Sequence, residues 1–106
     1  MKTREDLINY IEEKTKLMVT VARAKNADYA GAGTDPFQNF TRVESLGICK
    51  TEVGFLTRMT DKLCRIASFV AAGTLQVKDE SVQDTLLDLS CYCLLMSAYI
   101  ESKKSA

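Results

Sequence analysis

Apolar side chains recur every three or four residues along three long stretches of this 106-residue chain, and this period constrains the fold more than any other feature. The stretches cover residues 4–25, about 51–71 and about 79–102. Charged residues fill the intervening positions, as they do in amphipathic helices. No alternating pattern longer than a few residues favours a strand. The sequence therefore predicts an all-α fold, a compact helical bundle of three long helices and one short helix.

Several residues predict where these helices begin and end. Thr3 followed by Asp6 is typical of an N-cap with an acidic third position. Asn26 can close the first helix, because asparagine tolerates the left-handed conformation. Asp35 before Pro36 predicts the cap and first position of the short helix. Two glycines set the remaining ends, Gly47 after the short helix and Gly73 after the second long helix.

The length of the chain limits the number of domains, and its charge argues against some classes of partner. We expect one domain over residues 1–106, with a glycine-rich loop at 26–36 and a frayed tail at 103–106. Fourteen basic and fourteen acidic residues cancel, which argues against long nucleic acid and anionic membranes as partners. The charged N-terminus has no apolar signal region, and no apolar run is long enough to span a bilayer. These features predict a cytoplasmic protein.

The cysteine and histidine content limits the chemistry. The chain has four cysteines without CxxC spacing and no histidine, so a Cys–His or Ser–His catalytic pair is excluded. Cys91 and Cys93 would project about 200° apart on a helix and could not hold one ion together. We expect reduced thiols that are mostly buried as small hydrophobic residues.

Three acidic residues, Glu80, Asp84 and Asp88, stand at i, i+4 and i+8 in the last predicted helix. They share a face that becomes apolar further along, so we expect them to point into a covered region. Stacked carboxylates repel one another, and a divalent cation, a basic partner or protonation must compensate. Alternatively, Ser81 and Asp84 form a capping box and the helix dipole favours Glu80. Asp88 lies too deep in the helix for either effect to explain its position. In the functional interpretation of the trio, Asp84 and Asp88 are candidate ligand residues.

Three basic residues, Arg58, Lys62 and Arg65, lie along one flank of the second long helix. They would repel one another unless an anion lies nearby, either the carboxylates of the last helix or the phosphates of a ligand. Asp61 and Arg65 also have the spacing of an ordinary i, i+4 ion pair. We predict that all three bind phosphate, with Lys62 and Arg65 as the leading contacts. Glu52 falls on the core side of the same helix.

The glycine-rich loop at 26–36 and the residues after it combine aromatic rings with amide side chains. Flat rings and paired donors and acceptors suit the stacking of a base and the recognition of its edge. Phe37 and Phe40, three residues apart, are better explained as anchors of the short helix to the core. No P-loop is present, because the GAG segment lacks the lysine and follows no strand. The candidate base or ribose ligands are Asn26, Asp28, Tyr29 and Asn39.

The segments KNADYAGAGTDPFQNF, RMTDKLCRI and DESVQDTLLDLSCYCLL occur in this order. Together they resemble the small all-α domain of phages and bacteria called nucleotide modification associated domain 1, over roughly residues 20–100. Members of that family are common in phage genomes near nucleotide-handling genes. The resemblance implies a phage protein with a nucleotide-type ligand, acting in the host cell cytoplasm.

The last predicted helix is also similar in style to the all-α nucleoside triphosphate pyrophosphohydrolases of the MazG and dimeric dUTPase type. Those enzymes bind magnesium through an ExxE motif on one helix and an ExxD motif on a neighbour. This chain has Glu80-x-x-x-Asp84 for the second motif and no ExxE on the helix that should face it. The absence of the ExxE motif argues against hydrolysis more strongly than against ligand binding. We therefore expect no catalytic residue and no cofactor, with magnesium on Glu80, Asp84 and Asp88 only in the enzyme alternative.

These observations favour a small protein that binds a phosphorylated nucleotide, and such a protein could sequester a host signalling nucleotide as an anti-defence sponge. Two alternatives stay open: a magnesium-dependent nucleoside triphosphate pyrophosphohydrolase or nucleotide-modification accessory enzyme, and a non-catalytic helical protein-interaction module. A last helix that is apolar on two faces also leaves more apolar surface than so short a chain can cover. We expect a homodimer or higher homo-oligomer, with the last helix near the interface.

Overall fold

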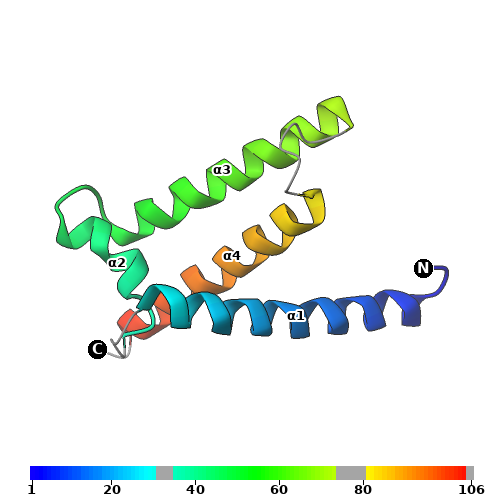
Figure 1. Cartoon of the computed structure of the whole chain (residues 1–106), viewed down its shortest axis with the longest axis horizontal. Helices are drawn as coiled ribbons and strands as arrows, with labels where there is room; N and C mark the ends of the chain where they lie inside the picture. Colours follow the sequence, from blue (N-terminus) through cyan, green and yellow to red (C-terminus); the bar gives the residue numbers. More distant parts are fainter. Residues whose placement is uncertain (31–34, 74–80, 105–106) are drawn as a thin grey trace. The chain divides into compact units, whose positions relative to one another are not determined.

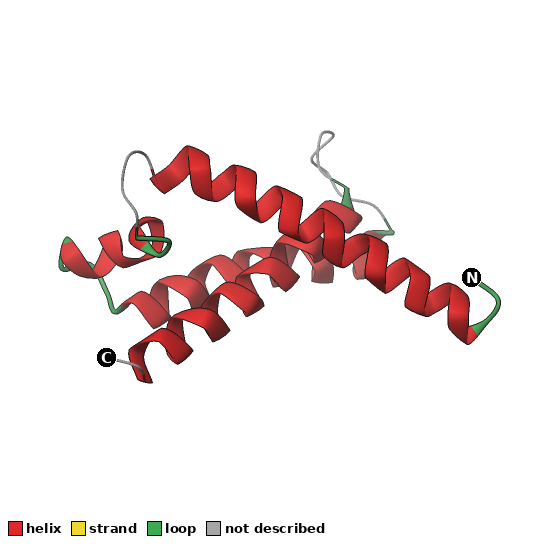
Figure 2. Cartoon of the chain, turned by 90° about the horizontal axis from the view of Figure 1, so that it is seen from below, coloured by secondary structure: helices red, strands yellow, loops and turns green. Residues whose placement is uncertain are grey.

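The structure is a computed structural model that describes the backbone of residues 1–30, 35–73 and 81–104, and the side chains of these residues except 26–30. In these ranges every regular element is a helix and no strand is present (Figures 1 and 2). The predicted all-α class, with three long helices and one short helix, is confirmed. The helices are α1 (Arg4–Ala30), α2 (Gln38–Ser45), α3 (Thr51–Ala72) and α4 (Val82–Lys104).

None of the described helices combines the length and the apolar character that crossing a bilayer requires. The chain divides into two compact units, Met1–Pro36 with α1 and Phe37–Ala106 with α2, α3 and α4.

The first unit is built on α1, whose start was predicted correctly. The Asp6 N–H donates to Thr3 Oγ1 at 3.1 Å, and the Thr3 N–H donates back to Asp6 Oδ2 at 3.2 Å. The backbone N–H groups of Lys2 and then Thr3 hold the pKa of the Asp6 carboxyl below its usual value. The prediction that Asn26 closes this helix is wrong, because α1 continues to Ala30. Alanines around Asn26 favour the helical conformation strongly enough to carry the helix through it.

The short helix α2 begins later than Asp35 and Pro36 predicted. Its first residue is Gln38, and Phe37 takes the cap position without a side-chain hydrogen bond. Instead, the Phe37 ring contacts Tyr99 of α4 at 5.5 Å between centroids. A tertiary ring contact at Phe37 thus accompanies the start of α2, where local sequence suggested an aspartate cap. The end is as predicted: Gly47 has a φ of +74°, a left-handed conformation that glycine adopts without strain.

In the second unit, α3 packs against both α2 and α4. The close approach of α2 depends on Gly54, because a Cβ there would lie 3.0 Å from Val43 Cγ2. The α3 and α4 helices run antiparallel, so Glu52 near the start of α3 contacts Lys103 near the end of α4. As predicted, α3 ends before Gly73, which has a φ of +77°. Among the described residues, the fully buried side chains are Thr51, Phe55 and Thr85.

The end of α4 differs from the prediction, whereas its predicted start is not tested. The expected start at about 79 falls outside the described residues, and the helix is observed from Val82. The expected frayed tail is wrong for Lys103 and Lys104, which belong to the helix. Lys103 Nζ lies 3.2 Å from Glu52 Oε2, and this contact with α3 holds the last turn of α4 in place.

The predicted burial of the apolar residues is only partly correct. Phe55 is buried, but Leu63 and Leu94 keep 58% and 60% of their surface exposed. The expectation of mostly buried cysteines is also wrong. All four are free thiols; Cys64 and Cys93 are exposed and the other two are half-buried. Helical spacing showed which residues share a face but did not show which face would be covered.

Candidate functional site

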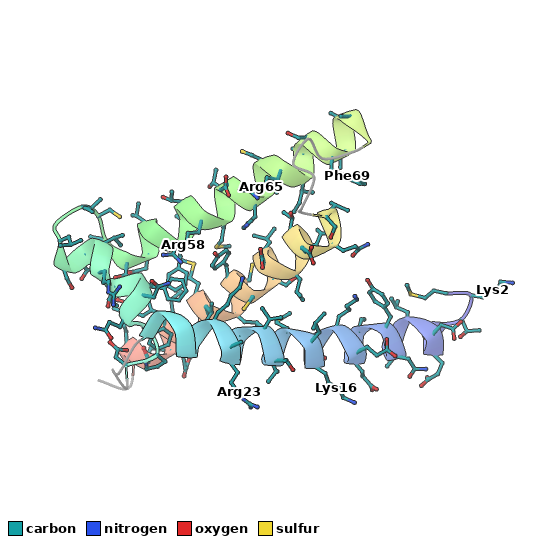
Figure 3. All side chains as sticks on the ribbon, in the orientation of Figure 1. Lys2, Lys16, Arg23, Arg58, Arg65 and Phe69 are labelled. Carbon is teal, nitrogen blue, oxygen red and sulfur yellow. The ribbon has the colours of Figure 1, made fainter. Side chains whose placement is uncertain are left out.

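The three predicted phosphate-binding residues lie on the half-buried side of α3. Figure 3 shows Arg58 and Arg65 projecting from α3 toward the α4 side. The structure gives each basic residue a different kind of neighbour: an aromatic ring for Arg58, a carboxylate of α4 for Lys62, and a carboxylate of α3 for Arg65. The three are therefore not equivalent, although their spacing made them look so.

Arg58 is stacked on an aromatic platform. Its guanidinium carbon lies 4.7 Å from the centroid of the Phe40 ring. Phe40 is in turn stacked on Phe55, with centroids 4.5 Å apart and planes inclined by 14°. Within the described residues, the Arg58 guanidinium makes no hydrogen bond or ion pair. Because stacking uses only the flat face of a guanidinium, its N–H edges remain available to an anion.

Lys62 joins α3 to α4. Its Nζ lies 3.3 Å from Asp88 Oδ2, and the two side chains are only 14% and 22% exposed. This contact explains why an acid can stand so deep in α4, where neither the cap nor the helix dipole favours it. Two kinds of anion were considered as neighbours of the three basic residues of α3. One of them, a carboxylate of the last helix, is present beside Lys62.

Arg65 makes the ordinary contact that its spacing suggested. Its Nη2 lies 3.3 Å from Asp61 Oδ2 on the same helix, with the side chains 38% and 58% exposed. An exposed i, i+4 pair contributes only about 0.3–0.5 kcal/mol. Such a pair holds the guanidinium weakly and leaves it able to exchange partners.

The two described members of the acidic trio, Asp84 and Asp88, contact different partners. Ser81 Oγ accepts a hydrogen bond from the Asp84 N–H at 3.0 Å, which confirms the capping alternative for Asp84. Asp84 is exposed, so the expectation of a covered position is wrong for it. Asp88 contacts Lys62, and Glu80 lies outside the described residues. Among described residues, no group of three or more His, Cys, Asp or Glu side chains could hold a metal.

A second polar cluster surrounds the start of α3. The Thr51 N–H donates to Glu44 Oε1 at 2.9 Å, and Lys103 Nζ donates to Glu52 Oε2 at 3.2 Å. The backbone N–H of Glu52 and then Lys103 lower the pKa of the Glu52 carboxyl from its ordinary 4.5. The hydrogen bond to Glu52 raises the pKa of Lys103 from its ordinary 10.5. Glu52 was expected on the core side, but sequence reasoning missed Glu44 and Lys103, because no local pattern relates them to α3.

The candidate base ligands are described only in part. Asn26, Asp28 and Tyr29 belong to the α1 backbone and not to a loop, and their side chains lie outside the described residues. Asn39 is half-buried on α2. Phe37 and Phe40 anchor α2 to the core, as expected, because they contact rings of α3 and α4. Sequence reasoning did not single out the two tyrosines of α4 that complete this cluster, Tyr92 and Tyr99.

Comparisons of the chain with protein-family models, with curated proteins and with solved structures find no match. The resemblance to nucleotide modification associated domain 1 therefore stays a proposal.

Proposed function

We propose that this protein binds a small phosphorylated nucleotide and that Arg58 is its principal phosphate ligand. One observation carries the proposal: Arg58 is half-buried, stacked on Phe40, and without a carboxylate among the described residues. A guanidinium held by an aromatic ring loses little rotational freedom when it binds. Its free N–H edge matches the two oxygens of a phosphate.

Lys62 and Arg65 have supporting roles in this proposal. Lys62 lies one helical turn from Arg58, and its contact with Asp88 fixes the ammonium close to the inner side of α3. Arg65 lies one turn further and forms an exposed contact with Asp61. A ligand with several phosphates could therefore bind Arg58 first and then recruit Arg65 from Asp61. The sequence predicted Lys62 and Arg65 as the leading phosphate contacts, whereas Arg58 is the principal phosphate ligand in this proposal.

The family resemblance extends this proposal to the biological setting. A phage protein that binds a nucleotide without a complete metal site would act in the host cytoplasm by sequestering a signalling nucleotide. Asn26, Asp28, Tyr29 and Asn39 are the proposed ligands of the base or ribose. Because Asp84 contacts Ser81 and Asp88 contacts Lys62, the hydrolase alternative gains no support from the described carboxylates.

Binding experiments on Arg58 variants test the proposal. Native mass spectrometry of freshly purified protein should identify a ligand, and calorimetry with that nucleotide should measure its affinity. A charged phosphate hydrogen bond is worth roughly 1.5–3 kcal/mol, so Arg58→Ala should weaken binding about 10- to 150-fold. Arg58→Lys should restore it only in part, because lysine lacks the planar fork. Arg42→Ala, an exposed arginine of α2, is the matched control and should bind normally.

Two results would contradict nucleotide binding: no nucleotide from a mixed panel binds, or Arg58→Ala binds as well as the parent chain. Multiple turnover of a nucleotide with magnesium would instead favour the enzyme alternative.

A helical protein-interaction module is the second candidate, and the contact between Lys62 and Asp88 specifically favours it. In that case the basic residues of α3 and the acidic residues of α4 stabilise the packing of the two helices and bind no ligand. Lys62→Ala and Arg65→Ala would then lower the melting temperature, and no nucleotide would raise it. Thermal melts of both variants with and without nucleotide therefore separate the two candidates.

A further inference from the structure

The charged residues of α3 are distributed in the reverse of the usual order. Four of its five charged residues lie on the half-buried side, and Asp61 alone is exposed. The opposite side carries exposed apolar residues instead, among them Leu63 at 58% and Val70 at 76%. A helix in water normally exposes its charges and covers its apolar stripe. This inversion indicates that the outer side of α3 is a packing surface.

Six residues form this outer surface, and we name them the α3 seam: Val53, Leu56, Thr60, Leu63, Ala67 and Val70. All six are exposed, and their spacing alternates between three and four residues throughout. That spacing is the a and d pattern of a two-helix coiled coil. The seam holds no charge, so two identical seams can meet without like-charge repulsion. It extends for about 27 Å at 1.5 Å per residue.

We propose that the α3 seam docks a second copy of this chain, with the two α3 helices antiparallel about a two-fold axis between Thr60 and Leu63. The side-chain sizes match in this register. Leu56 meets Ala67 of the partner subunit, Thr60 meets Leu63 of the partner subunit, and Val53 meets Val70 of the partner subunit. Each leucine thus packs against a smaller residue, and each a position faces a d position.

Apolar surface beyond the seam extends the same interface. Specific protein interfaces bury about 800 Å² from each partner. Leu46 and Ile48, which immediately precede α3, are 74% and 69% exposed and add to the area available at one end of the seam. Leu94, on α4, is 60% exposed but lies outside this surface.

Light scattering on paired variants tests this docking. The parent chain should have twice its chain mass of 11.8 kDa at micromolar concentration. Leu63→Glu places a charge beside the two-fold axis and should give the single chain mass with its helical circular dichroism retained. Leu94→Glu is the matched control, because Leu94 is exposed to nearly the same degree, and it should remain a dimer.

Cross-linking tests the antiparallel register in a chain with the exposed Cys64 and Cys93 replaced by serine. Two Thr60 residues would be offset by about 4.5 Å along the helices, whereas two Val53 residues would be about 26 Å apart. Thr60→Cys should therefore form a disulfide-linked dimer on oxidation, and Val53→Cys should not.

A monomeric parent chain would overturn the proposal. A dimer that survives Leu63→Glu but dissociates with Leu94→Glu would move the interface to α4. Equal cross-linking through both engineered cysteines would exclude the antiparallel register. None of these outcomes depends on a nucleotide, so the docking can fail while the proposed function stands.

Discussion

The α3–α4 pair is held together differently in two regions. Near the start of α3, the aromatic rings of Phe37, Phe40, Phe55, Tyr92 and Tyr99 contact one another across α2, α3 and α4. Further along, Lys62 and Asp88 form an ion pair between the helices. The rings bury apolar surface, which is the main source of folding free energy. A shielded ion pair contributes little net stability but costs a great deal when one partner is lost.

Arg58 lies where these two regions meet. Its guanidinium rests on Phe40 of the aromatic region, and Lys62 follows one turn later. Along α3, the groups that stabilise the packing are thus separate from those of the proposed phosphate recognition. The aromatic region fixes the geometry, and the charged region offers groups that can bind an anion.

The largest expected effect is the loss of the Phe55 ring, which breaks the aromatic region. Phe55 is fully buried, and Phe55→Ala should lower the free energy of unfolding by about 3–5 kcal/mol. Urea denaturation followed by circular dichroism measures this value. Phe69→Ala, a half-buried phenylalanine at the other end of α3, is the control and should cost less. Equal losses in the two variants would show that the aromatic region has no special role.

A smaller loss of stability is expected when the ion pair of Lys62 with Asp88 is broken. Lys62→Met removes the ammonium group from beside the shielded Asp88 and should cost roughly 1–3 kcal/mol. The double variant Lys62→Met with Asp88→Leu should recover most of this loss, because an apolar pair needs no compensating charge. A double variant less stable than Lys62→Met would mean that the two side chains act independently.

The smallest effect concerns the Glu52–Lys103 contact at the aromatic end. Because the pKa of Glu52 is lowered, its contribution is present above pH 4.5 and disappears as the pH falls through the lowered value. Because the pKa of Lys103 is raised, its contribution is present below pH 10.5 and disappears as the pH rises through the raised value. Lys103→Met should therefore lower the melting temperature slightly at neutral pH and less in strong acid, where only the contact of Lys103 with the Tyr99 ring at 5.4 Å is lost. An equal difference at both pH values would contradict this.

Local sequence was sufficient for the helical elements and for several of their ends. The period of apolar residues predicted three long helices, and Thr3 with Asp6 predicted the cap of α1. Gly47 and Gly73 predicted the ends of α2 and α3, because a left-handed residue stops a helix wherever it stands. These features depend on residues within one or two turns, so no tertiary contact was needed to find them.

The tertiary structure decided which faces are covered and which charges have partners. Spacing alone made Arg58, Lys62 and Arg65 equivalent, but Phe40, Asp88 and Asp61 distinguish them. The partner of Lys62 belongs to another helix, as does Lys103, which pairs with Glu52 and fixes the last turn of α4. Contacts between residues far apart in the chain depend on how helices pack, and helical period leaves the covered side open. The sequence by itself therefore determined the helices and the set of candidate residues, whereas packing decided that α3 turns its charges inward and its apolar seam outward.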